Sequence, residues 1–249
     1  MKIATWNIGS GFISRDQKKF DHQDLNYFIE ELRKQNADVI CLQEVNTPAE
    51  HPKQTQSHDI ADALGFSHIA AQVMHPNHLQ PGNELSVAVL SRFPVLSTEY
   101  VTVPNPGIFA TGSNGARWIS FDKGFLFCDI NMEGKTVRVA SGHMLPFHKF
   151  KRNFLENEFT HIRTAIAEII FEHSTLPLVI GADMNFADVH ALVPQLFESG
   201  FTDLFQTDTT PDYGQCDHLI VSKEWKAQSW QVIPGNADHY LCIAEIQLN

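Results

Sequence analysis

The sequence predicts a mixed α/β fold in which large, partly antiparallel sheets are covered by helices. Three observations predict it. Short apolar runs typical of strands outnumber the amphipathic runs typical of helices. Several of the strand-like runs follow one another with no helix between them, as they do in hairpins. The chain has 249 residues, of which 43% are apolar and 19% charged, so it can bury a sizeable core and is neither disordered nor fibrous.

The expected strands are marked by β-branched and aromatic residues between turn formers. Residues 136–140 alternate between apolar and polar, which is typical of a half-exposed strand, whereas residues 176–180 are apolar apart from Pro177, as in a strand covered on both faces. We expect strands at residues 3–7, 38–43, 68–73, 85–91, 95–103, 118–121, 125–131, 136–141, 176–181, 218–221, 229–233 and 240–246.

Fewer segments predict helices, and they do so through apolar residues at helical spacing. A short helix over residues 60–64 is expected to end at Gly65, which is a common stop signal. Residues 104–115 are rich in proline and glycine and are expected to form a long loop, of the kind that is more often functional than a linker. Two longer helices are indicated by Leu25, Phe28, Ile29 and Leu32, and by Leu155, Phe159, Ile162, Ile166 and Ile169.

Composition and charge limit the classes of function. No linker or repeat interrupts the sequence, so we expect one domain over residues 1–249. The net charge of −11 disfavours a sequence-independent grip on DNA but allows a local basic site. No apolar run of about 18 residues occurs and the first residues do not resemble a signal peptide, so no stable membrane association is expected.

The cysteines point to a reducing compartment. The chain has four of them, Cys41, Cys128, Cys216 and Cys242, and none forms a Cys-x-x-Cys pair. Their surroundings and spacing favour buried thiols over a disulfide framework. We therefore expect a cytoplasmic protein.

Acid and amide side chains fall at the ends of several expected strands. Each of them can be explained as a turn former, and Asn185 can simply cap a helix over residues 189–196. As a set they suggest more, because residues at strand ends share the rim of a sheet, where open sheets usually place their sites. The set comprises Asn7, Glu44, Asp183, Asn185, Asp217, Asp238 and His239.

Two kinds of metal chemistry are compatible with these residues. Glu44, Asp238 and the amide oxygen of Asn7 are hard oxygen donors, which suit Mg²⁺ or Mn²⁺. His75 and His78 could contribute to a zinc site, although Pro76 prevents a regular helix there. A zinc hydrolase has little support, because no histidine-rich ligand spacing occurs.

The remaining polar residues suit proton transfer. His239 can be held in one tautomer by a carboxylate, and Asp217 is a candidate for that role. Asp183 could orient or deprotonate a water molecule. His143 lies just beyond an expected strand and is a further candidate for the same rim.

The motifs occur in an order that resembles a known family. They are Thr5-Trp6-Asn7, Leu42-Gln43-Glu44, Leu90-Ser91-Arg92-Phe93-Pro94, Gly142-His143, Gly181-Ala182-Asp183-Met184-Asn185, Asp217-His218-Leu219-Ile220-Val221-Ser222 and Ala237-Asp238-His239. This series is similar to that of the endonuclease/exonuclease/phosphatase superfamily, also called DNase I-like, and it spans nearly the whole chain. The resemblance implies a four-layer α/β/β/α sandwich with two packed mixed sheets, and metal-assisted hydrolysis of a phosphate ester.

The resemblance also implies a cofactor and its ligands. It implies Mg²⁺ or Mn²⁺, with Glu44 as the main ligand and with Asn7 and Asp238 beside it. A divalent cation neutralises an oxygen of the anionic phosphoester and stabilises the leaving oxygen.

Catalytic roles follow from the same resemblance. It implies that His239, paired with Asp217, contacts the scissile phosphate or acts as the base. Asp183 would position the attacking water, and Asn185 would bind the phosphate or orient Asp183. His143 would stabilise the phosphate or assist the leaving group. Whether Asp183 or His239 is the base is left open.

Basic residues near two of the motifs are candidates for substrate binding. We expect Lys149, Lys151 and Arg152 to hold a substrate phosphate while Phe147 or a loop aromatic stacks on an organic group, with Arg117 as a further candidate. The alternative is a solvated start of a helix.

A second basic cluster, formed by Arg15, Lys18 and Lys19, follows the Asn7 motif. Together the two clusters offer too few phosphate contacts for a long nucleic acid. The expected substrate is therefore a short nucleic acid, a nucleic-acid end or a small phosphodiester, and no protein partner is inferred.

Departures from the family pattern narrow the possibilities. Ile8-Gly9-Ser10 replaces the Asn-Gly-Leu-Arg segment that follows the first motif in abasic-site endonucleases, which disfavours that activity. Cys216-Asp217-His218-Leu219 also differs from the signature of inositol polyphosphate 5-phosphatases. A sphingomyelinase-like lipid phosphodiesterase is the alternative substrate class. A non-catalytic binding module is a further alternative, although all the acids and histidines of the motifs are present.

Overall fold

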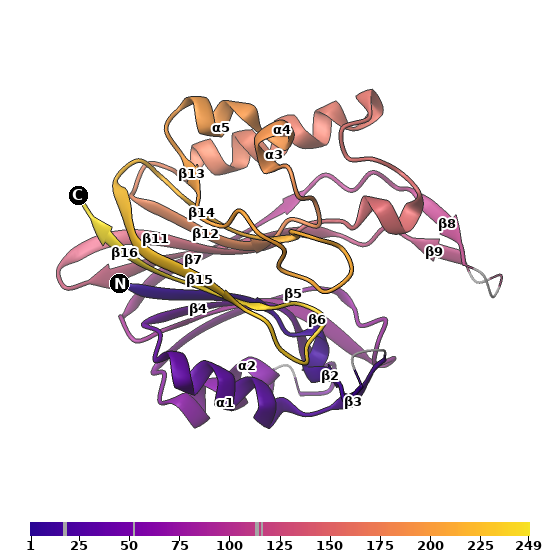
Figure 1. Ribbon diagram of the computed structural model, residues 1–249, viewed down its shortest axis with the longest axis horizontal. Coiled ribbons are helices and arrows are strands. Elements are labelled where there is room, and N and C mark those ends of the chain that lie inside the picture. Colours follow the sequence, from indigo (N-terminus) through magenta and orange to yellow (C-terminus); the bar gives the residue numbers. More distant parts are fainter. Residues whose placement is uncertain (17–18, 52, 113–114, 116) are drawn as a thin grey trace.

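The computed structural model describes residues 1–16, 19–51, 53–112, 115 and 117–249. Two six-stranded sheets pack face to face, and helices cover the outer face of each (Figure 1). This arrangement confirms the expected mixed α/β fold with two packed mixed sheets. Lys18, and Ser113 and Asn114 of the expected loop, lie outside the described residues.

The first sheet contains both ends of the chain. Its strands β1 and β4 are parallel, and its other pairings are antiparallel. In order across the sheet the strands are β15 (Trp225–Ile233), β16 (Leu241–Leu248), β1 (Lys2–Asn7), β4 (Val39–Pro48), β6 (Asn83–Ser91) and β5 (His68–Pro76).

The second sheet has one parallel pair, β11 with β12. The expected doubly covered strand, residues 176–181, corresponds to β12, which is buried along its whole length. In order across the sheet the strands are β13 (Thr202–Asp203), β14 (Asp217–Val221), β12 (Leu178–Asp183), β11 (Lys135–His143), β10 (Lys123–Met132) and β7 (Val95–Val103).

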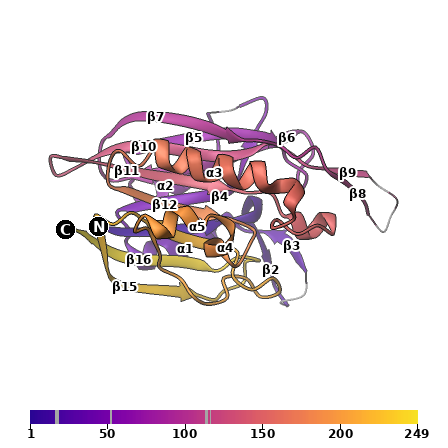
Figure 2. The same ribbon diagram turned by 90° about the horizontal axis from the view of Figure 1, so that it is seen from above.

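The helices form the two outer layers. Helices α1 (Leu25–Gln35) and α2 (Gln56–Leu64) cover the first sheet, and α3 (Thr160–Glu172), α4 (Val189–Leu192) and α5 (Pro194–Glu198) cover the second (Figures 1 and 2). Asp24 caps α1 by accepting a hydrogen bond from the Tyr27 amide, and α2 ends at Gly65 in the left-handed conformation, as expected. Within the described ranges, no helix is both long and apolar enough to cross a bilayer.

Two helix predictions require correction. The regular part of the expected helix starting at Leu155 begins only at Thr160, because Asn153 and Glu156 hold the preceding segment in turns that lead into a 3₁₀ turn, η3 (Asn157–Phe159). The helix expected over residues 189–196 is two short helices, since Pro194 starts the second. Asp188, and not Asn185, caps α4.

Two small hairpins project from the end of the molecule opposite the chain termini (Figures 1 and 2). They are formed by β2 (Phe12–Ser14) with β3 (Phe20–Gln23), and by β8 (Phe109–Thr111) with β9 (Arg117–Ile119). Strand β8 lies in the region that the sequence predicts as a long loop, and β9 overlaps the strand expected at residues 118–121. Short 3₁₀ turns η1 (Gly9–Gly11) and η2 (Phe147–Phe150) lie after β1 and β11.

The two sheets pack closely against each other where β12 crosses β1 and β4. A Cβ atom on Gly181 would lie 2.8 Å from the Cβ of Thr5 and 2.9 Å from that of Cys41, so only glycine fits there. The side-chain amide of Gln43 crosses the interface and donates to Ser141 Oγ and to the Gly181 carbonyl, both at 3.1 Å. The four cysteines are buried as free thiols.

Candidate active site

Three polar residues form a row across neighbouring strands of the second sheet. His143 at the end of β11 pairs in register with Asp183 at the end of β12, and Asp183 pairs with Asp217 at the start of β14. Residues in register on adjacent strands point to the same face of a sheet. The pairing therefore brings together three side chains that are distant in the sequence.

The first sheet supplies the opposite side. Asn7 ends β1, and Glu44 lies where the register of β4 with β6 shifts between Leu42 and Val45. Glu44 has a φ of 51°, in the left-handed region, so the irregularity redirects its side chain. His239 precedes β16, and its carbonyl accepts a hydrogen bond of 2.9 Å from the Trp6 indole.

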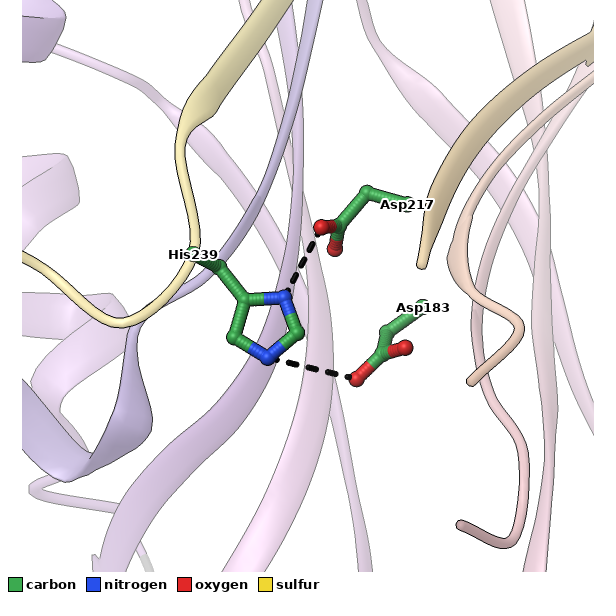
Figure 3. Close-up of side chains that lie close together, drawn as sticks. All are labelled: Asp183, Asp217 and His239. Carbon is green, nitrogen blue, oxygen red and sulfur yellow. Dashed lines mark hydrogen bonds and ion pairs between the residues drawn. The ribbon is translucent and has the colours of Figure 1, made fainter. Parts of the chain in front are cut away.

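His239 is held between two aspartates (Figure 3). Its Nδ1 lies 2.8 Å from Asp217 Oδ2, and its Nε2 lies 3.8 Å from Asp183 Oδ2. Burial disfavours the charged ring, but the two carboxylates outweigh it and raise the pKa of His239 well above its usual value. At neutral pH His239 is therefore a cation that donates from Nδ1 to Asp217.

Asp183 is buried at the centre of the site. Its Oδ1 accepts the Asn185 backbone N–H at 2.8 Å, and its Oδ2 accepts the Asn7 side-chain amide at 2.9 Å. Burial raises the pKa of Asp183 to about 6, the positive charge of His239 lowers it, and the nearby Asp217 raises it. Asp183 therefore changes its charge close to physiological pH.

A buried lysine completes the row. Lys123, at the start of β10, places Nζ 3.1 Å from Nδ1 and 3.3 Å from Nε2 of His143. An ammonium group only donates, so it fits Nδ1 as the acceptor and leaves the proton on Nε2, which lies 3.4 Å from Asp183 Oδ2. Burial, followed by the charge of Lys123, lowers the pKa of His143 well below its usual value, so this ring is neutral.

Glu44 and Asp238 fit a divalent cation. Burial opposes the ionisation of Glu44, but Lys123 and other positive groups outweigh it and lower its pKa. Asp238 Oδ1 is buried without a hydrogen-bond partner among the described residues, and burial raises the pKa of this carboxyl. A Cβ atom on Gly9 would lie 3.1 Å from Asp238 Oδ1. A cation between these acids would satisfy an oxygen that the protein leaves unpaired.

The other donor groups fit a metal less well. Among the described residues, Asp183, Asp217 and His239 are close enough to share an ion, but a protonated His239 has no lone pair for one. The Asn7 oxygen already accepts the Gly9 N–H at 3.0 Å, so its ligand role stays a prediction.

Most of these side chains line one pocket of about 430 Å³, and Asn7 and Asp217 support it through Asp183 and His239. This volume is typical of a site for one small molecule. Besides the polar residues, its wall contains Lys149 and Arg117 and apolar side chains that include Trp118, Phe121 and Phe150. The pocket therefore joins a charged floor to a largely apolar wall.

The sequence profile described as "Endonuclease/Exonuclease/phosphatase family" matches residues 4–239. The chain belongs to this family. No curated protein matches the sequence.

Solved structures of other members of the endonuclease/exonuclease/phosphatase family show the same fold. One from Beutenbergia cavernae DSM 12333 has a TM-score of 0.74 at 17% identity, covering 100% of this chain and 71% of that one. The human Nocturnin catalytic domain has a TM-score of 0.70 at 13% identity, covering 100% and 93%. The mannosyl-6-phosphatase of Bacteroides thetaiotaomicron has a TM-score of 0.66 at 13% identity, covering 100% of both chains.

In this family member, not every expected substrate-binding residue reaches the pocket. Lys149 and Arg117 line it, whereas Arg152 forms ion pairs with Glu156 and Glu158 and lies over the ring of Phe159. Its guanidinium is already neutralised, so the expectation that Arg152 binds substrate is not supported by its position.

The expected aromatic contact also changes. Phe147 is buried against Phe154 and Phe159, so it belongs to the core. The indole and phenyl rings that line the pocket are those of Trp118, Phe121 and Phe150. These rings, and not Phe147, are the candidates for the expected stacking on an organic group of the substrate.

Sequence reasoning missed Lys123 as a site residue. The available signal was a charged residue directly before the apolar run 124–128, the same kind of signal that marked Asp217. His75 and His78 line the pocket, but His75 Nδ1 donates to the Pro76 carbonyl at 2.9 Å and burial lowers its pKa to about 4. Neither histidine joins a three-residue metal cluster among the described residues.

Proposed function

We propose that the protein is a divalent-cation-dependent phosphoesterase that hydrolyses a phosphodiester or phosphomonoester in a compact, nucleotide-sized substrate. One observation carries this proposal: a single pocket is lined by an acidic pair, by several cationic side chains and by Asp183 and His239, with Asp217 supporting His239 from behind. Membership of the endonuclease/exonuclease/phosphatase family supports it, as does the fold shared with a mannosyl-6-phosphatase.

Glu44 and Asp238 would hold the cation, which is Mg²⁺ or Mn²⁺, because both are carboxylates and one oxygen of Asp238 is unpaired. When bound, the cation neutralises a phosphoryl oxygen and stabilises the charge on the leaving group. The protein's own residues then orient the ester and manage the proton.

Asp183 is the better candidate for the base. A base must be unprotonated, and Asp183, with a pKa of about 6, is ionised at pH 7. His239 is protonated at that pH, so it can donate a hydrogen bond to a phosphoryl oxygen but cannot accept a proton. Asn7 and Asn185 hold the two oxygens of Asp183 in place.

Phosphate charge would be balanced by Lys123 and by the Nε2–H of His143. Burial lowers the pKa of Lys123 to about 8, and the carboxylates of Glu44 and Asp183 act in the opposite direction. The ammonium is therefore charged at pH 7. Fixed donors in a buried site stabilise the charge that grows in the transition state, because they need no reorganisation.

Metal dependence and substrate size are tested together. Purified protein is assayed with Mg²⁺, with Mn²⁺ and with EDTA on bis-p-nitrophenyl phosphate, p-nitrophenyl phosphate, dinucleotides, long duplex DNA and sphingomyelin. We expect turnover only with metal, and dinucleotides preferred to duplex DNA because a pocket of about 430 Å³ suits one small molecule. Activity that persists in EDTA contradicts the metal requirement, and a preference for duplex or sphingomyelin contradicts the compact substrate.

Lys149 provides a test of substrate binding with a matched control. Lys149→Ala is expected to raise KM for dinucleotide about tenfold, because a charge-assisted contact to phosphate is lost. Lys151 lies two residues further on, is exposed and does not line the pocket, so Lys151→Ala should leave KM unchanged. Equal effects of the two substitutions on steady-state kinetics would show that general charge matters and that this contact does not.

A further inference from the structure

A second Asp–His pair lies on the other face of β14. Side chains alternate along a strand, so Asp217 faces the pocket and its neighbour His218 faces the helical layer. His218 is fully buried, with Nδ1 2.8 Å from Asp203 Oδ2 and Nε2 3.0 Å from the carbonyl oxygen of Phe186. The site described above does not use this pair.

One partner of His218 fixes the hydrogen on Nε2. A carbonyl oxygen only accepts, so Nε2 carries a hydrogen and donates it to Phe186. Asp203 is itself held, because the Gln215 amide donates to Asp203 Oδ2 at 3.2 Å and to the Phe205 carbonyl at 2.9 Å. The ring therefore has one orientation, with Nε2 directed at the segment that follows β12.

That segment carries a site residue in an unusual conformation. Asn185, which precedes Phe186, has a φ of 50°, in the left-handed region. In this conformation its backbone N–H reaches Asp183 Oδ1 at 2.8 Å, and its side-chain amide donates to the Met144 carbonyl at 3.1 Å. The Phe186 carbonyl lies one peptide beyond Asn185, and its hydrogen bond from His218 restrains the backbone whose path both of these bonds require.

We propose that His218, supported by Asp203, is a positioning residue that acts through the Phe186 carbonyl to hold Asn185 and, through it, the Asp183 carboxylate. This inference rests on the proposed phosphoesterase function for its kinetic consequences. Both residues are buried and would affect the reaction without contacting the substrate. Errors of about 1 Å in the position of a reacting group can cost about 10²-fold in rate.

Two amide substitutions separate the bond to Phe186 from the other properties of the ring. Both His218→Gln and His218→Asn remove the imidazole. The Gln side chain places its amide near the position of Nε2 and can still donate to Phe186, whereas the shorter Asn side chain reaches only the position of Nδ1. We expect His218→Asn to lower kcat on bis-p-nitrophenyl phosphate with Mn²⁺ about tenfold, with KM changed less than about twofold, and His218→Gln to stay within about threefold of wild type.

A double-mutant cycle tests whether the effect passes through Asn185. In the Asn185→Ala background the side-chain bond to the Met144 carbonyl is lost, although the backbone N–H that reaches Asp183 remains. Part of the fixed geometry is then already gone, so His218→Asn should lower kcat by clearly less than tenfold there. A full tenfold loss in that background, or equal losses for the Asn and Gln variants, would overturn the proposal. Melting temperatures of all variants show whether a loss of kcat merely follows a loss of folded protein.

Hydrogen exchange of the metal-free protein gives a readout that needs no activity. The Asn185 amide is expected to exchange faster in His218→Asn than in wild type and His218→Gln, while amides in β6 are unchanged. Unchanged protection of Asn185 in His218→Asn would overturn the positioning role. If wild type shows no turnover on any ester, the proposed function fails, and this measurement still decides the inference.

Discussion

Asp183→Asn is expected to lower kcat for phosphoester hydrolysis about 10³-fold while the protein stays folded. The amide has nearly the same shape as the carboxylate, so it can still accept the Asn185 N–H, but it cannot take a proton from water. The measurement is kcat and KM on bis-p-nitrophenyl phosphate with saturating Mn²⁺, and KM is expected to change little because the loss concerns the reaction step.

The pH dependence distinguishes Asp183 from His239 as the base. Only ionised Asp183 can accept a proton, so the wild-type rate should rise with pH and level off above the pKa of Asp183. That pKa is about 6 without a metal, and a bound cation lowers it because the cation favours the carboxylate. This limb should vanish in Asp183→Asn. The control is Asp62→Asn, which removes an exposed carboxylate on α2. A tenfold or smaller loss with the limb intact would exclude Asp183 as the base.

Glu44→Gln is expected to weaken binding of Mn²⁺ at least about 10²-fold and to lower kcat/KM at subsaturating metal by a similar factor. The substitution keeps the size of the side chain and removes a carboxylate whose pKa is already lowered by Lys123 and other cations. Isothermal titration of the metal-free protein with MnCl₂ measures the affinity directly, without requiring turnover.

A matched substitution keeps the Glu44 test specific. Glu245 is an exposed glutamate on β16, so Glu245→Gln changes the net charge by the same amount far from the pocket floor. It should leave Mn²⁺ affinity unchanged. Wild-type affinity in Glu44→Gln would remove Glu44 from the metal site, and equal weakening by both substitutions would point to the overall acidic charge of the protein.

The fold was predictable to a large extent because its signals are local. The residue pattern over 95–103 matches β7 in full, and the pattern over residues 176–181 reveals β12 as a strand covered on both faces. Strand β8 was missed, because the proline and glycine residues around it indicate a loop, whereas the strand expected at residues 118–121 overlaps β9. The extra strand length of β4 was missed as well, since Glu44 interrupts the pattern and an irregular register absorbs it.

Most residues of the candidate site could be predicted from the sequence, but the contacts between them could not. Polar side chains at strand ends marked Asp183, Asp217 and His239, and the structure brings these three together. The same reasoning treated Lys149 and Arg152 alike, although Lys149 lines the pocket and Arg152 is neutralised by two glutamates. Residues close in the sequence can point in different directions, and only the path of the chain through η2 decides which of them lines the pocket.

By itself the sequence determined which chemistry is available: carboxylates, amides and histidines at the ends of apolar strands, in the order typical of one family. The tertiary structure alone decided how that chemistry is arranged. Strand pairing within the second sheet set His143 and Asp217 beside Asp183 and brought Lys123 to His143, and sheet packing brought His239 to them. Protonation states followed, because a pKa depends on burial and on charges a few ångströms away, and neither is a property of a residue's position in the sequence.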